Sequence, residues 1–277
     1  MKRPTPWLVA RTAAIALIGI LVASSAVLLW SLWRADASSR PDAASEDRAH
    51  RLAALPRVIL WAWERPEDLR FLPANKIGVS FLAETVTLSG RNVRVRPRLQ
   101  TLRVNPVTPL LACARIETDA KLAPELTAGQ VSATASALAA LGRIDGVVAV
   151  QVDFDATISQ RHFYADVLRD FRRRLPPDMP LSITALASWC MDDPWIAGLP
   201  VDEAVPMLFR MGPDAEDARL LLGRGRDFSL SVCRTSVGIS TDEPIRDLPA
   251  GRRRYVFRPQ GWSPGAVGAL FAQENQR

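Results

Sequence analysis

The sequence feature that most constrains the fold is a series of eight short apolar or β-branched runs, separated by helical or loop segments. This alternation is typical of parallel strands joined by crossovers, and eight such strands can close into a barrel. The sequence therefore predicts an α/β fold, a (β/α)8 TIM barrel over residues 56–277. The predicted strands are Val58–Trp63, Ile77–Ala83, Pro109–Ile116, Val147–Phe154, Leu181–Ala187, Ala204–Phe209, Phe228–Arg234 and Tyr255–Arg258.

Helical patterns occupy several of the gaps between these strands. Ser159 and Ser263 are suitable N-caps, and Pro264 suits the first position of a helix. The predicted helices are Ala123–Leu141, Ser159–Leu175, Pro213–Leu222 and Ser263–Gln273.

One gap has a different pattern. Residues 85–104 alternate apolar and polar positions around Ser89-Gly90-Arg91-Asn92, which predicts a β-hairpin inserted after the second strand. Arg94, Arg96 and Arg98 share one face of its return strand. Such a row could hold an anionic polymer or phospholipid headgroups, but charge that protects an edge strand from aggregation explains it too. The modest net charge of +6 favours the second interpretation.

The N-terminal region contains 22 consecutive residues without a charge, Thr12–Trp33, enough to cross a bilayer core of about 30 Å as a helix. Basic residues precede the run and tryptophans lie near its ends, which predicts a signal-anchor over residues 1–34 with a cytoplasmic N-terminus. The barrel would then lie outside the cytoplasm, which in a bacterium is the periplasmic side of the inner membrane. A signal peptide cleaved after Ala37 is the alternative, but its apolar region would be unusually long.

Residues 35–55 are rich in Ala, Ser, Asp and Arg and predict a short polar tether. The three cysteines, Cys113, Cys190 and Cys233, have no metal-ligand spacing, and burial as small apolar side chains is the favoured interpretation. An exported compartment permits one disulfide among them, with one thiol left over.

Acidic residues follow four of the predicted strands. Glu64 ends the first, Glu84 and Glu117 follow the second and third, and Asp153 and Asp155 close the fourth. Because reacting groups of such barrels come from the carboxyl ends of strands, these carboxylates are the candidate catalytic residues.

The fourth strand gives the most specific prediction. Its apolar residues at 148, 150, 152 and 154 should face the helices, which turns Gln151, Asp153 and Asp155 toward the barrel axis. Alternate positions lie about 6.6 Å apart, so the two carboxylates should couple and one pKa should rise. A structural role, in which an arginine such as Arg115 or Arg210 neutralises the pair, is the competing interpretation. A functional site is favoured, because buried acids are costly.

The sequence from Gln151 to Asp155 resembles the fourth-strand motif D-x-D-x-E of chitinase-like glycoside hydrolases, and Met207-Leu208-Phe209 resembles their sixth-strand M-x-Y. Over about residues 57–262 the chain more closely resembles a bacterial family designated domain of unknown function 3142. Trp61-Ala62-Trp63-Glu64, the segment from Ala185 to Cys190 and the segment from Asp202 to Gly212 carry that resemblance. It implies a glycosidase-like barrel and no established reaction.

Three departures from the chitinase pattern bear on mechanism. Gln151 stands in place of the first aspartate, Asp155 in place of the glutamate proton donor, and Phe209 lacks the tyrosine hydroxyl. Together they argue against a substrate-assisted N-acetyl mechanism. If Asp155 is the acid, Glu84 or Glu117 across the barrel mouth is a candidate partner.

Tryptophans near strand ends favour a carbohydrate ligand, since flat rings stack on the apolar faces of sugars. At least two of Trp61, Trp63, Trp189, Trp195 and Trp262 are nevertheless expected in ordinary packing. The residues predicted to bind substrate are Gln151, Trp61, Trp63, Glu64, Arg115, Trp189, Met207, Phe209, Arg210 and Trp262.

The remaining chemistry is limited. Two histidines, His50 and His162, form neither a catalytic triad nor a metal site, and no phosphate-binding glycine loop is present, so no cofactor, metal or nucleic acid partner is predicted. The leading hypothesis is a glycoside hydrolase-like barrel acting on a cell-envelope or secreted polysaccharide, with Asp155 as proton donor and Asp153 as its electrostatic partner. The alternative is a non-catalytic glycan-binding or scaffolding barrel at the membrane surface.

Overall fold

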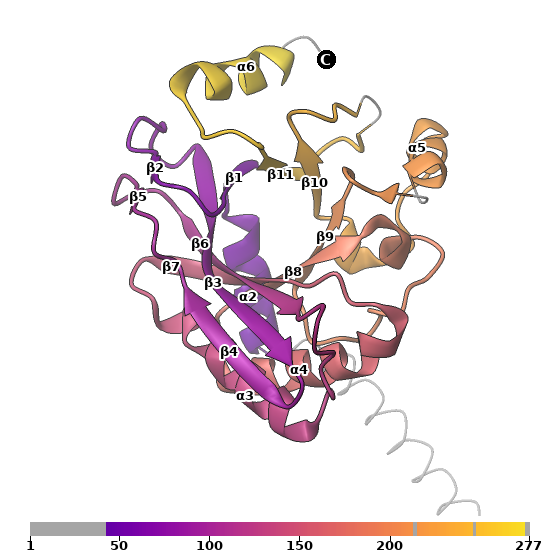
Figure 1. Cartoon of the computed structure of the whole chain (residues 1–277). Helices are drawn as coiled ribbons and strands as arrows, with labels where there is room; N and C mark the ends of the chain where they lie inside the picture. The colour runs from indigo at the N-terminus through magenta and orange to yellow at the C-terminus, as the bar shows by residue number, and fades with distance from the viewer. Residues whose placement is uncertain (1–42, 213–214, 246–247, 275–277) are drawn as a thin grey trace, which may run out of the picture. The chain divides into compact units, whose positions relative to one another are not determined.

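The computed structural model describes residues 43–212, 215–245 and 248–274, and its centre is a closed barrel of eight parallel strands (Figure 1). The barrel closes because the first strand pairs with both the last strand and the second barrel strand. The predicted fold class, an α/β protein with an eight-stranded parallel barrel, is confirmed. The strands are β1 (Val58–Ala62), β3 (Ile77–Ser89), β6 (Leu110–Thr118), β7 (Val147–Asp153), β8 (Leu181–Leu186), β9 (Glu203–Met207), β10 (Ser236–Ser240) and β11 (Arg253–Phe257).

One predicted strand is wrong. Phe228–Arg234 is a loop that ends in the 3-10 helix η5 (Ser231–Cys233), and the barrel strand β10 begins only at Ser236. The actual strand carries small residues on its inward side. At Gly238, an added Cβ would lie 3.0 Å from the Trp61 ring, so this strand leaves space for the large side chain of Trp61 on β1. Because β10 has few apolar residues, the pattern of apolar runs did not predict it.

The helices agree with the predicted ones in place, with shifted ends. Helix α3 begins five residues later than predicted, because Thr127 and Gln130 form a capping box at its start. Ser159 does not cap α4, since Thr157 forms a capping box with Gln160 one short turn earlier. Ser263 does accept a hydrogen bond from the Ala266 N–H at the start of α6. The helices are α3 (Ala128–Ala139), α4 (Arg161–Arg174), α5 (Ala215–Gly223) and α6 (Pro264–Glu274), with 3-10 turns η1 (Leu141–Arg143), η2 (Ile158–Gln160) and η3 (Ala187–Cys190).

The predicted hairpin is present, but its first strand is the extension of β3. Strand β4 (Asn92–Pro97) pairs antiparallel with β3 through a tight turn at Gly90, which has a positive φ of 51°. Beyond it, β5 (Leu102–Arg103) pairs with β2 (Glu67–Asp68) in a separate small sheet. Figure 1 shows β4 beside the long β3.

The hairpin arginines make internal contacts. Arg96 forms an ion pair with Glu64 and donates to the Thr85 hydroxyl. Arg98 donates to the carbonyls of Ala62, Trp63 and Arg65, at the end of β1. These contacts give two of the three arginines a structural role.

The segment predicted as a tether contains helix α2 (Ala43–Ala53). Leu52 and Leu55 are buried in the cluster that fills the barrel interior, and Arg253 of β11 donates to the Leu52 carbonyl. The second half of the predicted tether is therefore packed against the barrel. Among the described residues no helix is long and apolar enough to cross a membrane, and the predicted anchor at Thr12–Trp33 lies outside them.

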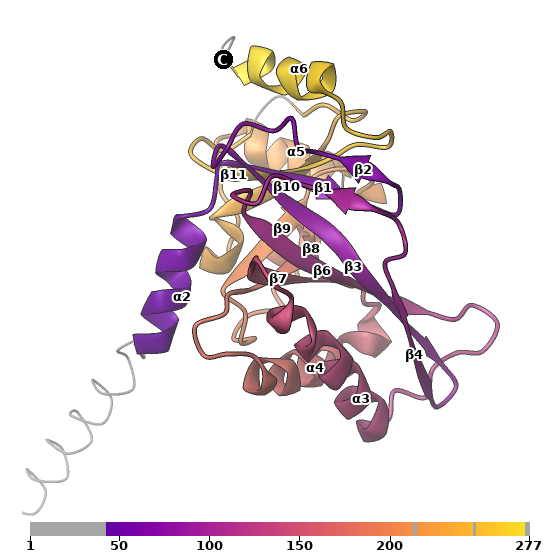
Figure 2. The ribbon, with the colours of Figure 1, turned by 90° about the vertical axis from the view of Figure 1, so that its left-hand side faces the viewer.

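Two kinds of packing hold the barrel. Ile59, Trp61, Leu111, Val205 and Tyr255 belong to the interior cluster, as expected for alternate positions of the strands. On the outside, β6–β9 pack against α3 and α4, which lie side by side in both views (Figure 2). Strands β1, β3 and β11 are covered by a smaller cluster that includes Trp262.

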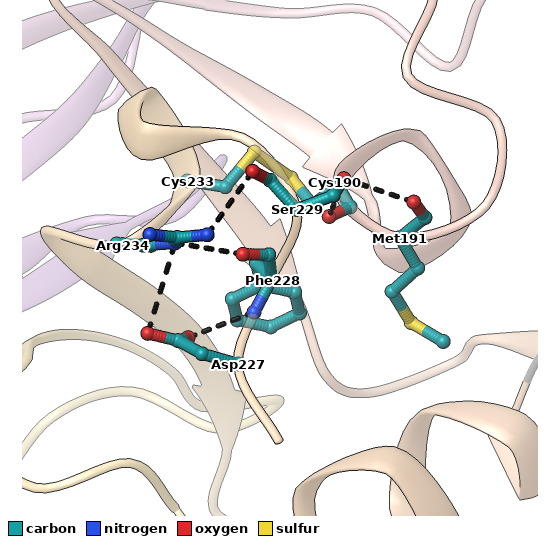
Figure 3. The surroundings of a disulfide bond; sticks show 7 residues. All are labelled: Cys190, Met191, Asp227, Phe228, Ser229, Cys233 and Arg234. Carbon is teal, nitrogen blue, oxygen red and sulfur yellow. Dashed lines mark hydrogen bonds and ion pairs between the residues drawn. A yellow bond between two sulfur atoms is a disulfide. The ribbon is translucent and has the colours of Figure 1, made fainter.

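Cys190 and Cys233 form a disulfide (Figure 3). Cys113 is a buried free thiol. The bond joins η3, after β8, to η5, before β10, and so spans β9 between them. The Ser229 hydroxyl donates to the carbonyls of Cys190 and Met191 beside the bond. All three cysteines are buried, as predicted, and two of them form the one disulfide that the sequence analysis left open.

Candidate active site

A pocket with a volume of about 270 Å³ lies at the carboxyl ends of the barrel strands. Its walls come from β1, β6, β7, β8, β9 and β11 and from the residues that follow them. This is the end of a parallel barrel at which ligands bind. The lining residues are Trp61, Trp63, Arg115, Asp153, Asp155, Thr184, Leu186, Ala187, Met207, Phe209, Arg210, Met211 and Phe257.

Strand β7 supplies the acidic side of the pocket. Val150 and Val152 pack outward with the helices, and Gln151 and Asp153 point into the barrel, as the alternation of the sequence predicts. The strand ends at Asp153, and Asp155 lies two residues beyond it at the rim.

Asp153 is a buried carboxylate with strong partners. The Thr184 hydroxyl donates to its Oδ1 at 2.8 Å, and Arg115 Nη1 donates to its Oδ2 at 2.7 Å. A buried carboxylate is stable in the charged form only when it is paired and hydrogen-bonded in this way. Asp153 is therefore held in one orientation beside the pocket.

Asp155 has a different environment. Its side chain is 49% exposed, and its Oδ2 lies 3.8 Å from Arg115 Nη2. Partial burial raises the pKa of Asp155, the charge of Asp153 raises it further, and Arg115 opposes both effects. Two neighbouring carboxyl groups thus differ in burial and in hydrogen bonding, the arrangement by which one site provides both a proton donor and a fixed charge.

Arg115 contacts both pocket aspartates and a third carboxylate, that of Glu117, outside the pocket. Its Nε donates to Glu117 Oε1 at 3.0 Å, while its other nitrogens face Asp153 and Asp155. Each of the three nitrogens of the guanidinium therefore faces a carboxylate of the chain.

The opposite side of the pocket is aromatic. Phe209 and Phe257 stack with their planes at 3° and their centroids 5.7 Å apart, and Trp61 lies 6.2 Å from Phe209. The Arg210 guanidinium lies over the Phe257 ring at 5.1 Å, and Arg210 has a positive φ of 52°, a left-handed conformation that few non-glycine residues adopt. Flat rings facing carboxylates form a surface suited to a sugar, whose faces are apolar and whose edges carry hydroxyls.

Six predicted site residues do not line this pocket. Gln151 is fully buried beneath it, and Trp189 and Trp262 pack in the outer clusters. Glu64 pairs with Arg96 and Glu117 pairs with Arg115, both at exposed positions.

The sixth, Glu84, lies in a separate small cleft with Glu64, Arg96, Arg98 and Gln100. Its Oε1 is buried and has no hydrogen-bond partner, and burial raises the pKa of Glu84 to about 7. The structure therefore brings Asp153 and Asp155 together with Trp61, Trp63, Met207, Phe209 and Arg210, and leaves Glu84 and Glu117 outside the pocket.

Several lining residues were missed by the sequence analysis: Thr184, Leu186, Ala187, Met211 and Phe257. The alternation used for β7 would have found three of them. Thr184 and Leu186 lie two and four residues after the inward Ser182 of β8, and Phe257 lies two residues after the inward Tyr255 of β11. Ala187 and Met211 follow strand ends, where alternation no longer applies.

No group of three or more His, Cys, Asp or Glu side chains suited to a metal occurs in the part of the chain that the structure describes. The polar contacts of the pocket come instead from carboxylates, guanidinium groups and one hydroxyl.

These features define the class of the protein: a parallel α/β barrel with an acidic and aromatic pocket at the carboxyl ends of its strands. Residues 106–208 match the model of a family described as a domain of unknown function, DUF3142, which confirms the predicted resemblance over β6 to β9. No curated protein matches the chain. A solved structure assigned as a chitinase A of Streptomyces coelicolor aligns with a TM-score of 0.47 and 8% identity, covering 78% of this chain and 95% of that one.

Proposed function

We propose that the barrel binds a saccharide in this pocket and hydrolyses a glycosidic bond, with Asp155 as the proton donor. The observation that carries the proposal is the unequal pair of carboxyl groups facing aromatic rings. Asp155 is partly exposed and has a raised pKa, so it keeps its proton to a higher pH than an ordinary aspartate does. In the reaction it gives that proton to the glycosidic oxygen as the bond between this oxygen and the anomeric carbon breaks. Water then bonds to the anomeric carbon and returns one proton to the Asp155 carboxylate.

Asp153 serves as the fixed negative charge. It is buried and held by Thr184 and Arg115, so it can stabilise positive charge that develops on the sugar ring as the bond breaks. Trp61, Phe209 and Phe257 would contact the face of the sugar.

The experiment that tests this proposal is a screen of the full chain against soluble fragments of cell-envelope and secreted polysaccharides, with product release as the readout. Asp155→Asn, which keeps the shape and removes the proton, is expected to lower turnover at least about a hundredfold. Asp192→Asn, an exposed acid outside the pocket, is the matched control and should leave turnover unchanged. Equal turnover by wild type and Asp155→Asn would exclude Asp155 as the donor.

A second function, glycan binding without turnover, is favoured by one observation. Arg115 faces both pocket aspartates and so partly neutralises the charges that catalysis would use. Under this alternative, a fragment binds saturably, no product forms, and Asp155→Asn retains the affinity of the wild type.

We also propose that the barrel is exported and attached to the membrane by the segment at Thr12–Trp33. The Cys190–Cys233 disulfide supports an oxidising compartment. Alkaline phosphatase, which folds only after export, should be active when fused after Arg34. An inactive fusion, together with chain found in the soluble cytoplasmic fraction, would contradict this proposal.

A further inference from the structure

The floor of the pocket is formed by the indole of Trp61, which is 4% exposed. Its Nε1 donates to Gln151 Oε1 at 2.8 Å inside the barrel. Its ring packs against Tyr255 at 5.5 Å and against Phe209 at 6.2 Å, and Gly238 leaves the space that its far edge occupies. The Trp61 ring therefore makes apolar contacts, and its indole N–H donates its hydrogen bond to Gln151.

Gln151 can offer its oxygen to Trp61 in only one orientation. The indole N–H is solely a donor, so the amide oxygen must face it, and the same oxygen accepts from the Ser80 hydroxyl at 3.0 Å. The amide nitrogen then donates to Ser182 Oγ at 3.2 Å. Both ends of the amide are satisfied, and Gln151 itself is fully buried.

A buried carboxylate sets the direction of this chain of hydrogen bonds. Glu203 is fully buried and accepts from the Ser182 hydroxyl at 3.0 Å, so that hydroxyl is left to accept from Gln151. Glu203 is itself fixed by Arg253 Nη1 at 2.8 Å and by the Tyr255 hydroxyl at 2.7 Å. The orientation of the Gln151 amide therefore follows from an ion pair deep in the barrel.

We propose that Gln151 is a positioning residue, which never touches the ligand and holds the Trp61 indole flat as the floor of the pocket. Without the amide oxygen, the indole N–H would be buried with no acceptor, and such a group costs more than a hydrogen bond gains. The pocket is open space beside the ring, so the ring would turn into it to reach water. The consequence for ligand affinity rests on the proposed function, whereas the position of Trp61 does not.

The test follows the indole N–H signals of the full chain in detergent micelles by nitrogen-15 NMR, with Trp61→Phe assigning the signal of Trp61. Gln151→Met removes the acceptor at nearly constant volume. It should shift the Trp61 signal and speed the exchange of its N–H with solvent by about tenfold.

Two further variants separate positioning from general loosening. Gln151→Glu, protonated in this buried place, keeps an acceptor for Trp61 and a donor for Ser182, and should restore the wild-type signal. Ser80→Ala removes a different donor to the same amide oxygen and should leave Trp61 in place. An unchanged Trp61 signal in Gln151→Met would overturn the inference, as would an equal change in Ser80→Ala.

None of these NMR measurements uses a ligand. A negative result for the position of Trp61 can therefore be told apart from a negative result for saccharide binding. For any fragment that binds the wild type, Gln151→Met and Trp61→Phe should each weaken binding by about tenfold, and the double variant should be no weaker than either. Additive losses in the double variant would contradict an action of Gln151 through Trp61.

Discussion

At the level of single residues, the two aspartates of the pocket differ in their surroundings. Asp153 has two short hydrogen bonds and is buried, whereas Asp155 is half-exposed and lies 3.8 Å from its nearest cation, Arg115. The pKa of Asp155 is raised by burial and by the charge of Asp153, and is lowered by Arg115. Changing each neighbour should therefore move this pKa in a defined direction.

Asp153→Asn should lower the pKa of Asp155, because it removes the neighbouring negative charge. Arg115→Met should raise the same pKa, because it removes the positive one. The carboxyl carbon-13 signal of Asp155, followed over a pH titration, measures both effects. Shifts of the same sign in the two variants would be inconsistent with this electrostatic description.

Glu84 gives a prediction about stability. The pKa of this buried carboxyl rises from an ordinary value of 4.5 to about 7 in the folded chain. Between these two values the unfolded chain releases a proton that the folded chain retains, so stability falls as the pH rises through this window. The loss reaches at most about 3 kcal/mol above pH 7.

Glu84→Gln should remove this pH dependence and be more stable than the wild type above pH 7. Urea unfolding at pH 4.5 and pH 8 measures the difference. Glu125→Gln, at an exposed position, is the control and should follow the wild type. A wild type whose stability is level between these two pH values would show that Glu84 ionises freely.

At the scale of elements, the β9–β10 seam is the weakest in the barrel. The register pairs only Met207 with Gly238, whereas other neighbouring barrel strands share three or more pairs. Pro206 in β9 has no N–H to donate. The Cys190–Cys233 bond joins the elements on either side of β9 and so holds this part of the pocket wall.

Replacing both Cys190 and Cys233 by Ala should lower the free energy of unfolding by about 4 kcal/mol, given the 43-residue separation that the bond closes. Thermal unfolding with and without reductant checks this. Reductant should lower the Tm of the wild type and of Cys113→Ala, and leave the double variant unchanged. A wild-type Tm that does not respond to complete reduction would argue against the bond.

The elements also show what could be predicted from sequence. Strands such as Val147–Asp153 are apolar runs bounded by turns, and the sequence locates them well. Strand β10 was not predicted because its inward positions are the small residues Ser236, Gly238 and Ser240. These small residues leave space for Trp61, which comes from a distant part of the chain. The strand was predicted instead at the apolar segment that contains Phe228 and Cys233, and both of these residues are buried in the outer packing. Local hydrophobicity does not distinguish a barrel strand from a buried loop.

The candidate site shows the same limit. Alternation along β7 placed Gln151 and Asp153 correctly inside the barrel, but it could not reveal that Gln151 lies below the pocket floor. Trp189 and Trp262 were predicted to bind substrate, yet they follow strands in loops that fold back over the outer clusters. The direction of a side chain is predictable within a strand and not beyond its end.

In the molecule as a whole, each end of the barrel is either closed by packed side chains or carries a pocket. One end carries the pocket, and at the other the interior cluster continues into Leu52 and Leu55. Arg253 connects this end to the buried Glu203 and to the Leu52 carbonyl. Residues 47–55 therefore belong to the folded barrel.

Leu52→Ala should destabilise the chain by about 2–5 kcal/mol, because it leaves a cavity in the interior cluster. Arg51→Ala, on the exposed side of the same helix, should change stability by less than about 1 kcal/mol, since its ion pair with Asp178 is exposed. Guanidinium unfolding of both variants makes the comparison. Equal losses of stability in the two variants would mean that Leu52 is not packed in the barrel interior.

Methionine methyl NMR of the full chain tests the claim that a saccharide binds in the pocket at the carboxyl ends of the strands. Met207 and Met211 line the pocket, while Met179 and Met191 lie in the outer packing. A binding polysaccharide fragment should shift the methyl signals of Met207 and Met211 and leave those of Met179 and Met191 in place. A bound fragment that shifts Met179 or Met191 and not the pocket pair would contradict the claim.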